Sequence, residues 1–227
     1  MYFCLMKNIF LFFFLSISFF LNAQKLPTGF VYLCNIEESI QSELRYITPH
    51  NFIGKPIDGY KKDTIIVSQK TAEALKEIQQ ILLKDGFSLK IFDAYRPQQA
   101  VDHFVRWATI LNDTLMKREY YPDIPKNQLF NLGYIASKSG HTRGSTVDLT
   151  IVNLKTKKEL DMGSPYDFFG EISHPFYKKI SKKQQENRVF LREIMLKKGF
   201  KPYNNEWWHF TLINEPFPST YFNFPIE

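Results

Sequence analysis

The sequence predicts an α+β fold with a small, mainly antiparallel sheet flanked by helices. Segments 68–85 and 184–198 place apolar residues at helical spacing, whereas 87–92 and 146–152 have the composition and pattern of strands. Helices and strands alternate irregularly, and glycine turns lie close to the strands on both sides of the candidate site. This order favours short antiparallel connections over the regular units of a doubly wound parallel sheet.

The first predicted helix covers residues 68–85. Ser68 is a candidate N-cap, and Gly86 stands where helices often end. The apolar residues at helical spacing are Ala72, Leu75, Ile78, Leu82 and Leu83. Spacing and end signals together predict an amphipathic helix.

A predicted strand over 87–92 follows and ends at the segment Asp-Ala-Tyr-Arg-Pro, residues 93–97. Pro97 can serve as the first residue of the next helix, which we expect to run to about Leu111. Arg96 is therefore expected at a strand-to-helix junction.

Three glycines, Gly133, Gly140 and Gly144, lie among polar residues ahead of the branched segment 146–152. Glycine-rich polar sequence is typical of turns, and branched residues favour strands. We expect a turn that leads into a strand.

A further amphipathic helix is predicted over 184–198, with Gly199 just beyond its end. Its apolar residues are Val189, Phe190, Ile194 and Leu196. A last strand is predicted from Trp207 to Leu212.

The composition is that of one globular domain. Apolar residues make up 44% of the 227 residues and charged residues 23%, which argues against disorder and against a multi-span membrane protein. No internal repeat or linker rich in glycine and serine follows residue 24. We expect residues 24–227 to form one catalytic domain.

Residues 1–23 have the pattern of a signal peptide. Lys7 precedes an apolar stretch over 9–21, which is shorter than the roughly 20 residues that span a bilayer, and Ala23 suits a cleavage site. Leu21 is larger than the small residue favoured three positions before a cut, so an uncleaved anchor is the alternative. The pattern predicts a periplasmic or secreted protein without stable membrane contact after cleavage.

Cleavage would leave Cys34 as the one cysteine, so an internal disulfide is excluded and we expect Cys34 to be a small buried residue.

The net charge of +6 becomes +5 without Lys7. Because the cations are scattered, a solvated surface is expected rather than a nucleic-acid partner. The sequence does not determine the oligomeric state.

Two histidines stand in unusual surroundings. His141 and Asp148 belong to the pattern S-x-H-x-x-G-x-x-x-D, in which they lie seven residues apart. Residues at that spacing point to opposite faces of a regular strand, so both can face one metal ion only if the chain bends between them. Gly144 is placed to allow the bend.

The second group is Glu206-Trp207-Trp208-His209 at the start of the last predicted strand. A zinc peptidase needs three protein ligands, an open position for water and a carboxylate base. The two groups together supply this set, with His141, Asp148 and His209 as ligands and Glu206 as base. The helical H-E-x-x-H motif of ordinary zincins is absent from the sequence.

Plainer alternatives exist for these residues. The two histidines could be hydrogen-bonded interior residues without a metal, and Arg96 could form only a structural salt bridge. Trp207 and Trp208 are expected to pack and exclude water. For the remaining histidines we expect no catalytic role: these are His50, His103 and His174.

At these residues the sequence resembles the zinc D-alanyl-D-alanine dipeptidases of the vancomycin-resistance type. The resemblance runs from about Leu44 to the C-terminus, through 44–46, 51–56, 58–60, 93–97, 136–139, 162–168, 206–209 and 221–225. It implies one zinc ion per chain, held at the centre of the sheet, and a small dipeptide as substrate.

The resemblance also implies roles for single residues. His141, Asp148 and His209 match the zinc ligands of the family, and Glu206 matches its general base. Arg96 matches the arginine that stabilises the oxyanion, a suitable task for a fixed guanidinium. The remaining matches bind substrate: Tyr46 and Asp167 its amino group, and Ser139 its carboxylate.

Three functions follow as hypotheses. The leading one is hydrolysis of D-alanyl-D-alanine to two D-alanines, and the export signal suggests salvage during cell-wall turnover rather than resistance. The second is a carboxypeptidase or endopeptidase on larger peptidoglycan peptides. The third is a non-catalytic zinc-binding or wall-binding module, which the presence of Glu206 disfavours. The ligand set suits other divalent ions as well, so the choice of zinc rests on the resemblance.

Overall fold

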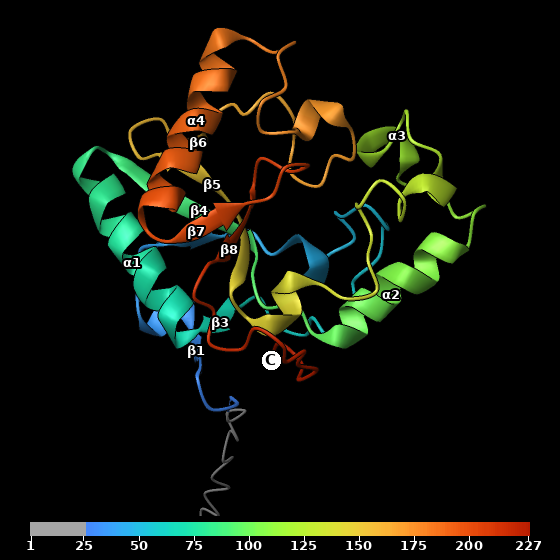
Figure 1. The fold of residues 1–227 in the computed structure, drawn as a ribbon, viewed down its shortest axis with the longest axis horizontal. Coiled ribbons are helices and arrows are strands. Elements are labelled where there is room, and N and C mark those ends of the chain that lie inside the picture. Colours follow the sequence, from blue (N-terminus) through green and yellow to red (C-terminus); the bar gives the residue numbers. More distant parts are fainter. Residues whose placement is uncertain (1–25) are drawn as a thin grey trace, which may run out of the picture.

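The computed structural model describes residues 26–227, so the predicted signal peptide lies outside the described residues. Figure 1 shows a central sheet with helices around it. The helices are α1 (Gln69–Lys84), α2 (Gln98–Thr109), α3 (Lys117–Tyr120) and α4 (Lys182–Lys197). The strands are β1 (Phe30–Tyr32), β2 (Gln41–Ser42), β3 (Ile66–Ser68), β4 (Phe87–Asp93), β5 (Thr146–Asn153), β6 (Lys158–Glu159), β7 (Phe200–Pro202) and β8 (His209–Leu212). Within residues 26–227 no helix has the length and apolar character of a membrane span.

The main sheet has the strand order β2-β4-β5-β8-β7, with β6 also paired to β5. The β2–β4 pair is parallel and the other pairs are antiparallel. A separate antiparallel pair consists of β1 and β3. The predicted α+β fold with a small, mainly antiparallel sheet is confirmed.

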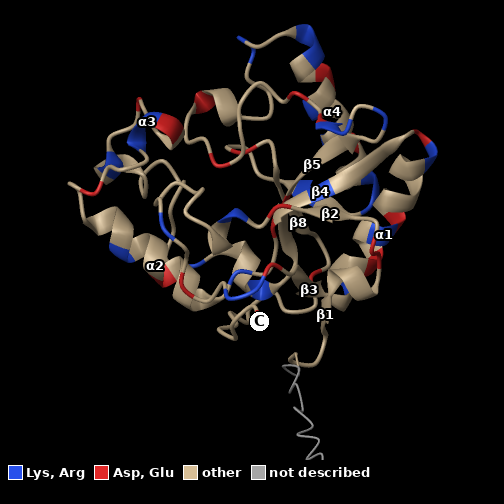
Figure 2. Ribbon diagram, turned by 180° about the vertical axis from the view of Figure 1, so that it is seen from behind, with Lys and Arg blue, Asp and Glu red and all other residues tan. Residues whose placement is uncertain are grey.

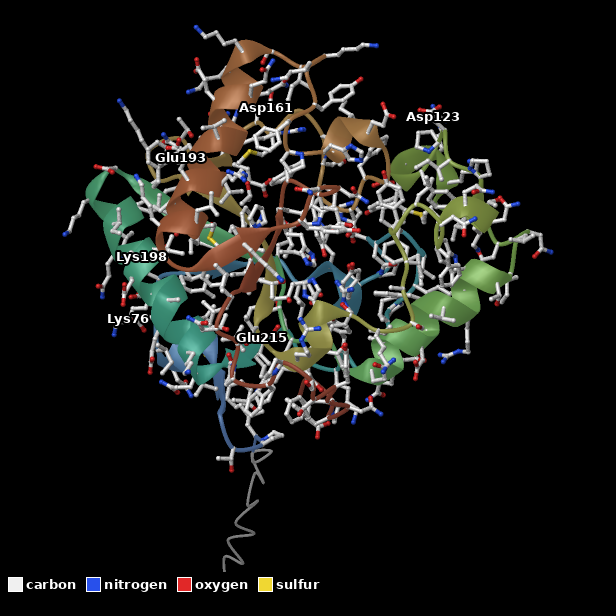
Figure 3. All side chains as sticks on the ribbon, viewed as in Figure 1. Lys76, Asp123, Asp161, Glu193, Lys198 and Glu215 are labelled. Carbon is white, nitrogen blue, oxygen red and sulfur yellow. The ribbon has the colours of Figure 1, made fainter. Side chains whose placement is uncertain are left out.

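Strand β5 forms the middle of the sheet and is buried from Thr146 to Val152. In Figure 1, α1 and α4 lie on one side of the sheet, and α2 and α3 lie on the other with long loops between them. Lys198, which follows α4 and is labelled in Figure 3, donates to Glu77 of α1 at 2.8 Å and so connects these two helices. The loops that precede β5 and β8 carry several residues of the candidate site.

Helix α1 begins and ends as predicted. Ser68 caps it by accepting a hydrogen bond from the Thr71 amide, and Gly86 follows with a positive φ of 77°. Four of the five expected apolar residues are buried, but Leu83 is exposed. It lies one position after Leu82, which turns it away from the row that faces the sheet.

The other two predicted helices differ at their ends. Pro97 is the N-cap of α2 rather than its first residue, and α2 ends at Thr109. Helix α4 begins earlier than predicted because Ser181 and Gln184 form a capping box. Val189 and Leu196 of α4 are exposed, contrary to the expected apolar face.

The last strand starts at His209, not at Trp207, because the two tryptophans belong to the preceding turn. Both tryptophans are buried, as expected of packing residues. Five short strands had no prediction from the sequence: β1, β2, β3, β6 and β7. Their two or three residues are too few for a recognisable periodicity.

Cys34 is exposed, so the expectation that it is buried is wrong. It lies in a short 3₁₀ turn, Leu33–Asn35, in which only Leu33 is buried.

Charged residues of both signs are mixed along the helices in Figure 2.

Candidate active site

Strand register brings three of the site residues into one row. Asp148 of β5 lies opposite His209 of β8 on one side and opposite Asp93 of β4 on the other. Paired residues of neighbouring strands point to the same face of a sheet. The pairing therefore places both carboxylates and the His209 imidazole side by side.

His141 reaches this row from a 3₁₀ turn, Gly140–Arg143, that precedes β5. Gly144 ends the turn with φ 78°, a left-handed conformation that glycine adopts readily. A Cβ on Gly144 would lie 2.2 Å from Cε1 of Phe30, so the tight packing also requires glycine. The predicted bend between His141 and Asp148 is present.

The metal-binding atoms of His141, Asp148 and His209 all lie within 4.8 Å of one another. His141 Nε2 is 3.3 Å from Asp148 Oδ2 and 3.3 Å from His209 Nδ1. Asp148 Oδ1 is buried 3.1 Å from His209 Nδ1, yet it accepts no hydrogen bond from any residue between 26 and 227. A buried carboxylate oxygen in this state suits a cation, so the three residues fit a divalent metal.

The backbone orients His141 for this task. Its Nδ1 lies 2.7 Å from the carbonyl oxygen of Ala94, a distance at which a protonated Nδ1 donates a hydrogen bond. Nε2 then carries the lone pair that faces Asp148 and His209. Burial lowers the pKa of His141, which keeps the imidazole neutral and able to bind a metal.

Glu206 lies beside this cluster, with Oε2 3.4 Å from His209 Nδ1. Burial, and then the negative charge of Asp148, raise the pKa of Glu206 to about 8. A carboxyl group with a raised pKa exchanges protons near neutral pH, as a general base must. A metal cation between the ligands would counteract this rise.

Arg96 occupies the expected junction between β4 and α2, and its position is fixed from three sides. Its Nε donates to Asp93 Oδ2 at 2.9 Å, and its guanidinium lies over the rings of Tyr46 and Phe104. A terminal nitrogen approaches Asp148 Oδ2 to 3.5 Å. Arg96 thus forms the structural salt bridge of the plainer alternative and also lines the candidate pocket.

Asp93 is a site residue that the sequence reasoning did not identify. It is fully buried, accepts from the Tyr60 hydroxyl at 2.7 Å, and lies 3.5 Å from His141 Nδ1. It therefore connects Arg96 to the metal cluster. The sequence signal that could have identified Asp93 is its position at a strand end, three residues before Arg96.

Asp167 and Tyr46 meet deep in the fold, where the Tyr46 hydroxyl donates to Asp167 Oδ2 at 2.8 Å. Asp167 is 6% exposed and has a positive φ of 62°, which is uncommon for aspartate. Burial, and then the charge of Asp148, raise the pKa of Asp167 well above its usual range. Tyr166 connects this pair to the metal cluster, because its hydroxyl lies 3.3 Å from the Tyr46 hydroxyl and 3.3 Å from Asp148 Oδ2.

Ser139 is the N-cap of the turn that carries His141, whose amide donates to Ser139 Oγ at 3.3 Å. Ser139 also lines the pocket. The three other histidines lie outside the lining of this pocket.

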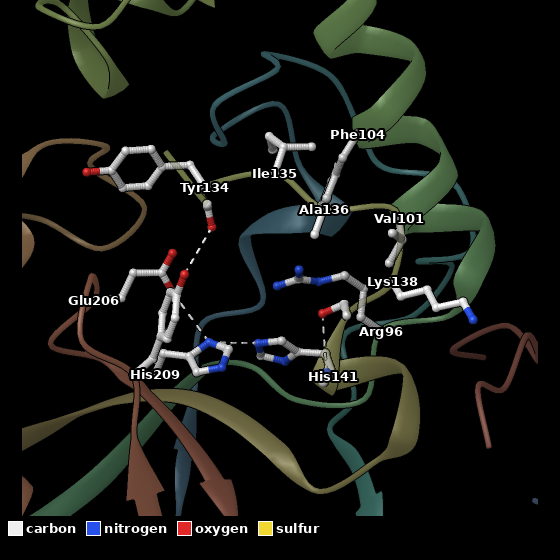
Figure 4. Close-up of a pocket in the computed structure, with 14 residues that line it drawn as sticks. Arg96, Val101, Phe104, Tyr134, Ile135, Ala136, Lys138, His141, Glu206 and His209 are labelled. Atoms are coloured by element: carbon white, nitrogen blue, oxygen red, sulfur yellow. Dashed lines mark hydrogen bonds and ion pairs between the residues drawn. The ribbon is translucent and has the colours of Figure 1, made fainter. Parts of the chain in front are cut away.

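Some of these side chains line a cavity of about 270 Å³, which we call the catalytic pocket. Figure 4 shows His141 and His209 along one side of it, with Arg96 and Glu206 approaching from different directions. Its lining residues are Arg96, Val101, Phe104, Gly133, Tyr134, Ile135, Ala136, Lys138, Ser139, Gly140, His141, Tyr203, Glu206 and His209. Asp148, Asp167 and Tyr46 are buried and are not among the lining residues.

Comparison with known proteins gives a consistent result. The chain is 44% identical over 202 residues to the D-alanyl-D-alanine dipeptidase of Enterococcus faecalis, a match that covers 89% of this chain and 100% of the relative. The dipeptidase of Enterococcus faecium is 41% identical and that of Streptomyces coelicolor is also 41% identical, with 88% and 87% of this chain covered and 98% of each relative.

A solved structure of VanYB in complex with D-alanine-D-alanine is also similar, with 14% identity and a TM-score of 0.42 over 68% of this chain and 76% of that one. The family model described as D-ala-D-ala dipeptidase matches residues 27–227. The chain therefore belongs to the D-Ala-D-Ala dipeptidase family and is a metallopeptidase.

Proposed function

We propose that this enzyme hydrolyses D-alanyl-D-alanine to two D-alanines with the help of one zinc ion. The observation that carries the proposal is the cluster of His141, Asp148 and His209 with Glu206 at its edge. Both histidines and Glu206 line a pocket of about 270 Å³. Relatives that are 41 to 44% identical to the chain are named D-alanyl-D-alanine dipeptidases.

His141, Asp148 and His209 would hold the zinc ion. When bound, zinc lowers the pKa of a coordinated water toward about 7 and polarises a carbonyl oxygen. Glu206 would accept a proton from the attacking water and return it to the leaving amine. Arg96, held in place by Asp93, would donate hydrogen bonds to the negative charge that develops on the carbonyl oxygen.

Asp167 supports a dipeptide rather than a longer peptide as substrate. Its carboxylate is buried and accepts from Tyr46, while its raised pKa reflects incomplete compensation of its charge. A buried carboxylate is stabilised by a cation at close range, and the free amino group of a dipeptide supplies one. Ser139, on the pocket lining, would bind the substrate carboxylate.

The test is an assay of purified protein on D-Ala-D-Ala, L-Ala-L-Ala and N-acetyl-D-Ala-D-Ala, with and without a chelator. We expect D-Ala-D-Ala to be preferred, activity to be lost on chelation and to return with zinc. Activity that survives complete removal of metal contradicts zinc dependence, and efficient cleavage of the acylated peptide favours a carboxypeptidase.

A Glu206→Gln variant tests the base separately from the metal site. General acid–base catalysis contributes about 100-fold to 10,000-fold, so we expect kcat to fall by that factor while zinc stays bound. Loss of zinc in this variant would mean that Glu206 is a ligand rather than the base.

We also propose that the enzyme acts outside the cytoplasm, in the periplasm or as a secreted protein, and salvages D-Ala-D-Ala released during wall turnover. Support comes from the signal-peptide pattern in residues 1–23. Cell fractionation and sequencing of the mature N-terminus test this. Mature enzyme in the cytoplasm, or protein that still begins at Met1, contradicts it.

A further inference from the structure

A second cavity, of about 800 Å³, lies next to the catalytic pocket; we call it the outer cavity. Its lining residues are Asp123, Ile124, Asn131, Leu132, Tyr134, Phe168, Gly170, Glu171, Ile172, His174, Tyr177 and Asn205. Tyr134 lines both cavities. In Figure 4 the Tyr134 ring points away from His141 and His209.

Residues 131–136, which we call the partition loop, separate the two cavities. Asn131 and Leu132 face the outer cavity, whereas Ile135 and Ala136 face the catalytic pocket. Figure 4 shows Ile135 and Ala136 across the pocket from the histidine ligands. This loop is therefore the wall that the two cavities share.

Two hydrogen bonds tie the partition loop to the connection between β7 and β8. Tyr203 donates from its hydroxyl to the Gly133 carbonyl oxygen at 3.3 Å, and Asn205 Nδ2 donates to the Leu132 carbonyl oxygen at 3.2 Å. Asn205 Nδ2 also lies 3.3 Å from the Tyr203 hydroxyl, which links the two bonds.

Gly133 allows the close approach at this closure. Its φ is 79°, and a Cβ there would lie 2.8 Å from the Tyr203 hydroxyl oxygen. The connection that supplies Tyr203 and Asn205 also carries Glu206, and the Tyr203 ring lies 5.4 Å from the His209 ring. The β7–β8 connection thus holds the partition loop in place and also carries the proposed catalytic base.

We propose that Tyr203 and Asn205 determine specificity by closing the partition loop, which keeps the catalytic pocket at the size of a dipeptide. The inference rests on the proposed dipeptidase function. Opening the closure would join the two cavities and admit a peptide extended at its amino end. Phe168, which lines the outer cavity, directly follows Asp167, the residue proposed to bind the amino group, so the outer cavity begins one residue from that proposed site.

The charge of the outer cavity defines the extension that would fit. Asp123 and Glu171 both line it, and Figure 3 shows Asp123 at the outer surface near α3. Two carboxylates favour a basic residue over an acidic one. L-Lys-D-Ala-D-Ala and L-Glu-D-Ala-D-Ala are therefore matched probes. Water would add across the D-Ala–D-Ala bond of the lysyl probe and release L-Lys-D-Ala and D-alanine.

The experiment uses a Tyr203→Phe, Asn205→Ala double variant of the zinc-loaded enzyme. Phenylalanine keeps a ring against His209 and removes the hydroxyl. We expect the ratio of kcat/KM for the lysyl tripeptide to kcat/KM for D-Ala-D-Ala to rise at least about tenfold, with the glutamyl probe gaining less. Hydrogen exchange in the partition loop should quicken by about tenfold, because both hydrogen bonds from the β7–β8 connection to the loop are lost.

Tyr32→Phe is the matched control, since its hydroxyl also donates to a backbone carbonyl oxygen, that of Glu227 at 2.9 Å, away from the pocket. This control should leave both the ratio and the loop exchange unchanged. Should the double variant fail to fold, Asn205→Ala alone removes one bond and should shift both readouts in the same direction.

An unchanged substrate ratio in a variant whose loop exchanges faster overturns the proposal, as does unchanged loop exchange. Failure of the dipeptidase function gives a different pattern: the wild type with zinc does not hydrolyse D-Ala-D-Ala at all. In that case calorimetry on a Glu206→Gln background, in which no turnover occurs, measures the affinities of the two tripeptides and of the dipeptide. The ratio of these affinities then replaces the ratio of kcat/KM.

Discussion

At the scale of single residues, the site depends on buried charges that constrain one another. Asp93 accepts from Tyr60 and Arg96 and lies near His141, so one carboxylate positions both the proposed oxyanion donor and a metal ligand. Such supporting groups are commonly worth about 10-fold to 100-fold in metal affinity or activity.

Asp93→Asn should therefore lower kcat by about 10-fold to 100-fold, because Arg96 loses its charged partner while the shape of the side chain is kept. Steady-state kinetics together with zinc analysis measure this. Glu43→Gln is the control, since Glu43 pairs with Arg45 in an ion pair outside the pocket lining. Equal effects of the two substitutions would show that Asp93 has no special role.

Asp167 should release a proton when the substrate binds. Burial and Asp148 raise its pKa in the free enzyme, which favours the protonated form, whereas a bound ammonium group favours the carboxylate. Calorimetric titration of D-Ala-D-Ala into a Glu206→Gln variant, in buffers with different ionisation enthalpies, measures the released protons. Asp167→Asn should abolish the release, and a binding enthalpy independent of buffer would contradict the prediction.

At the scale of elements, the site depends on strand register and on one turn. Asp93, Asp148 and His209 share a row across β4, β5 and β8, and a slip of one residue would turn a whole strand's side chains to the other face. The turn before β5 then adds His141 to the row through the left-handed Gly144.

Gly144→Ala should destabilise the fold more than Gly86→Ala. Both glycines have a positive φ, near 78° and 77°, so both substitutions introduce backbone strain of roughly 1 to 2 kcal/mol. A Cβ at Gly144 also collides with Phe30, whereas one at Gly86 meets nothing within 4 Å. We expect urea unfolding to show a further loss of about 1 to 3 kcal/mol for Gly144→Ala. Equal losses in the free energy of unfolding would show that the Phe30 ring moves aside at no cost.

At the scale of the whole molecule, the metal should couple the loops to the sheet. The proposed ligands come from the turn before β5, from β5 itself and from β8, so a bound ion would connect three segments. A ligand that binds only the folded state stabilises it by an amount set by its free concentration.

Zinc at about 100 times its dissociation constant should stabilise the wild type by about 2.7 kcal/mol against unfolding, and a chelator should remove this gain. Thermal or urea unfolding with and without zinc measures it. His209→Ala should show little gain. Equal stabilisation of the variant would place the metal elsewhere.

The sequence by itself determined the α+β class, helices α1 and α4, and strands β4, β5 and β8. It also predicted the His, Asp, His and Glu set, whose members lie together in the structure. These follow from periodicity, end signals and the restricted chemistry of zinc peptidases, which local sequence records. Only the tertiary structure decided that Asp93 supports Arg96, that Cys34 is exposed, and that Tyr203 and Asn205 hold a loop 70 or more residues away. Those properties depend on contacts between distant segments, and pairing of this kind leaves no periodic trace in either segment alone.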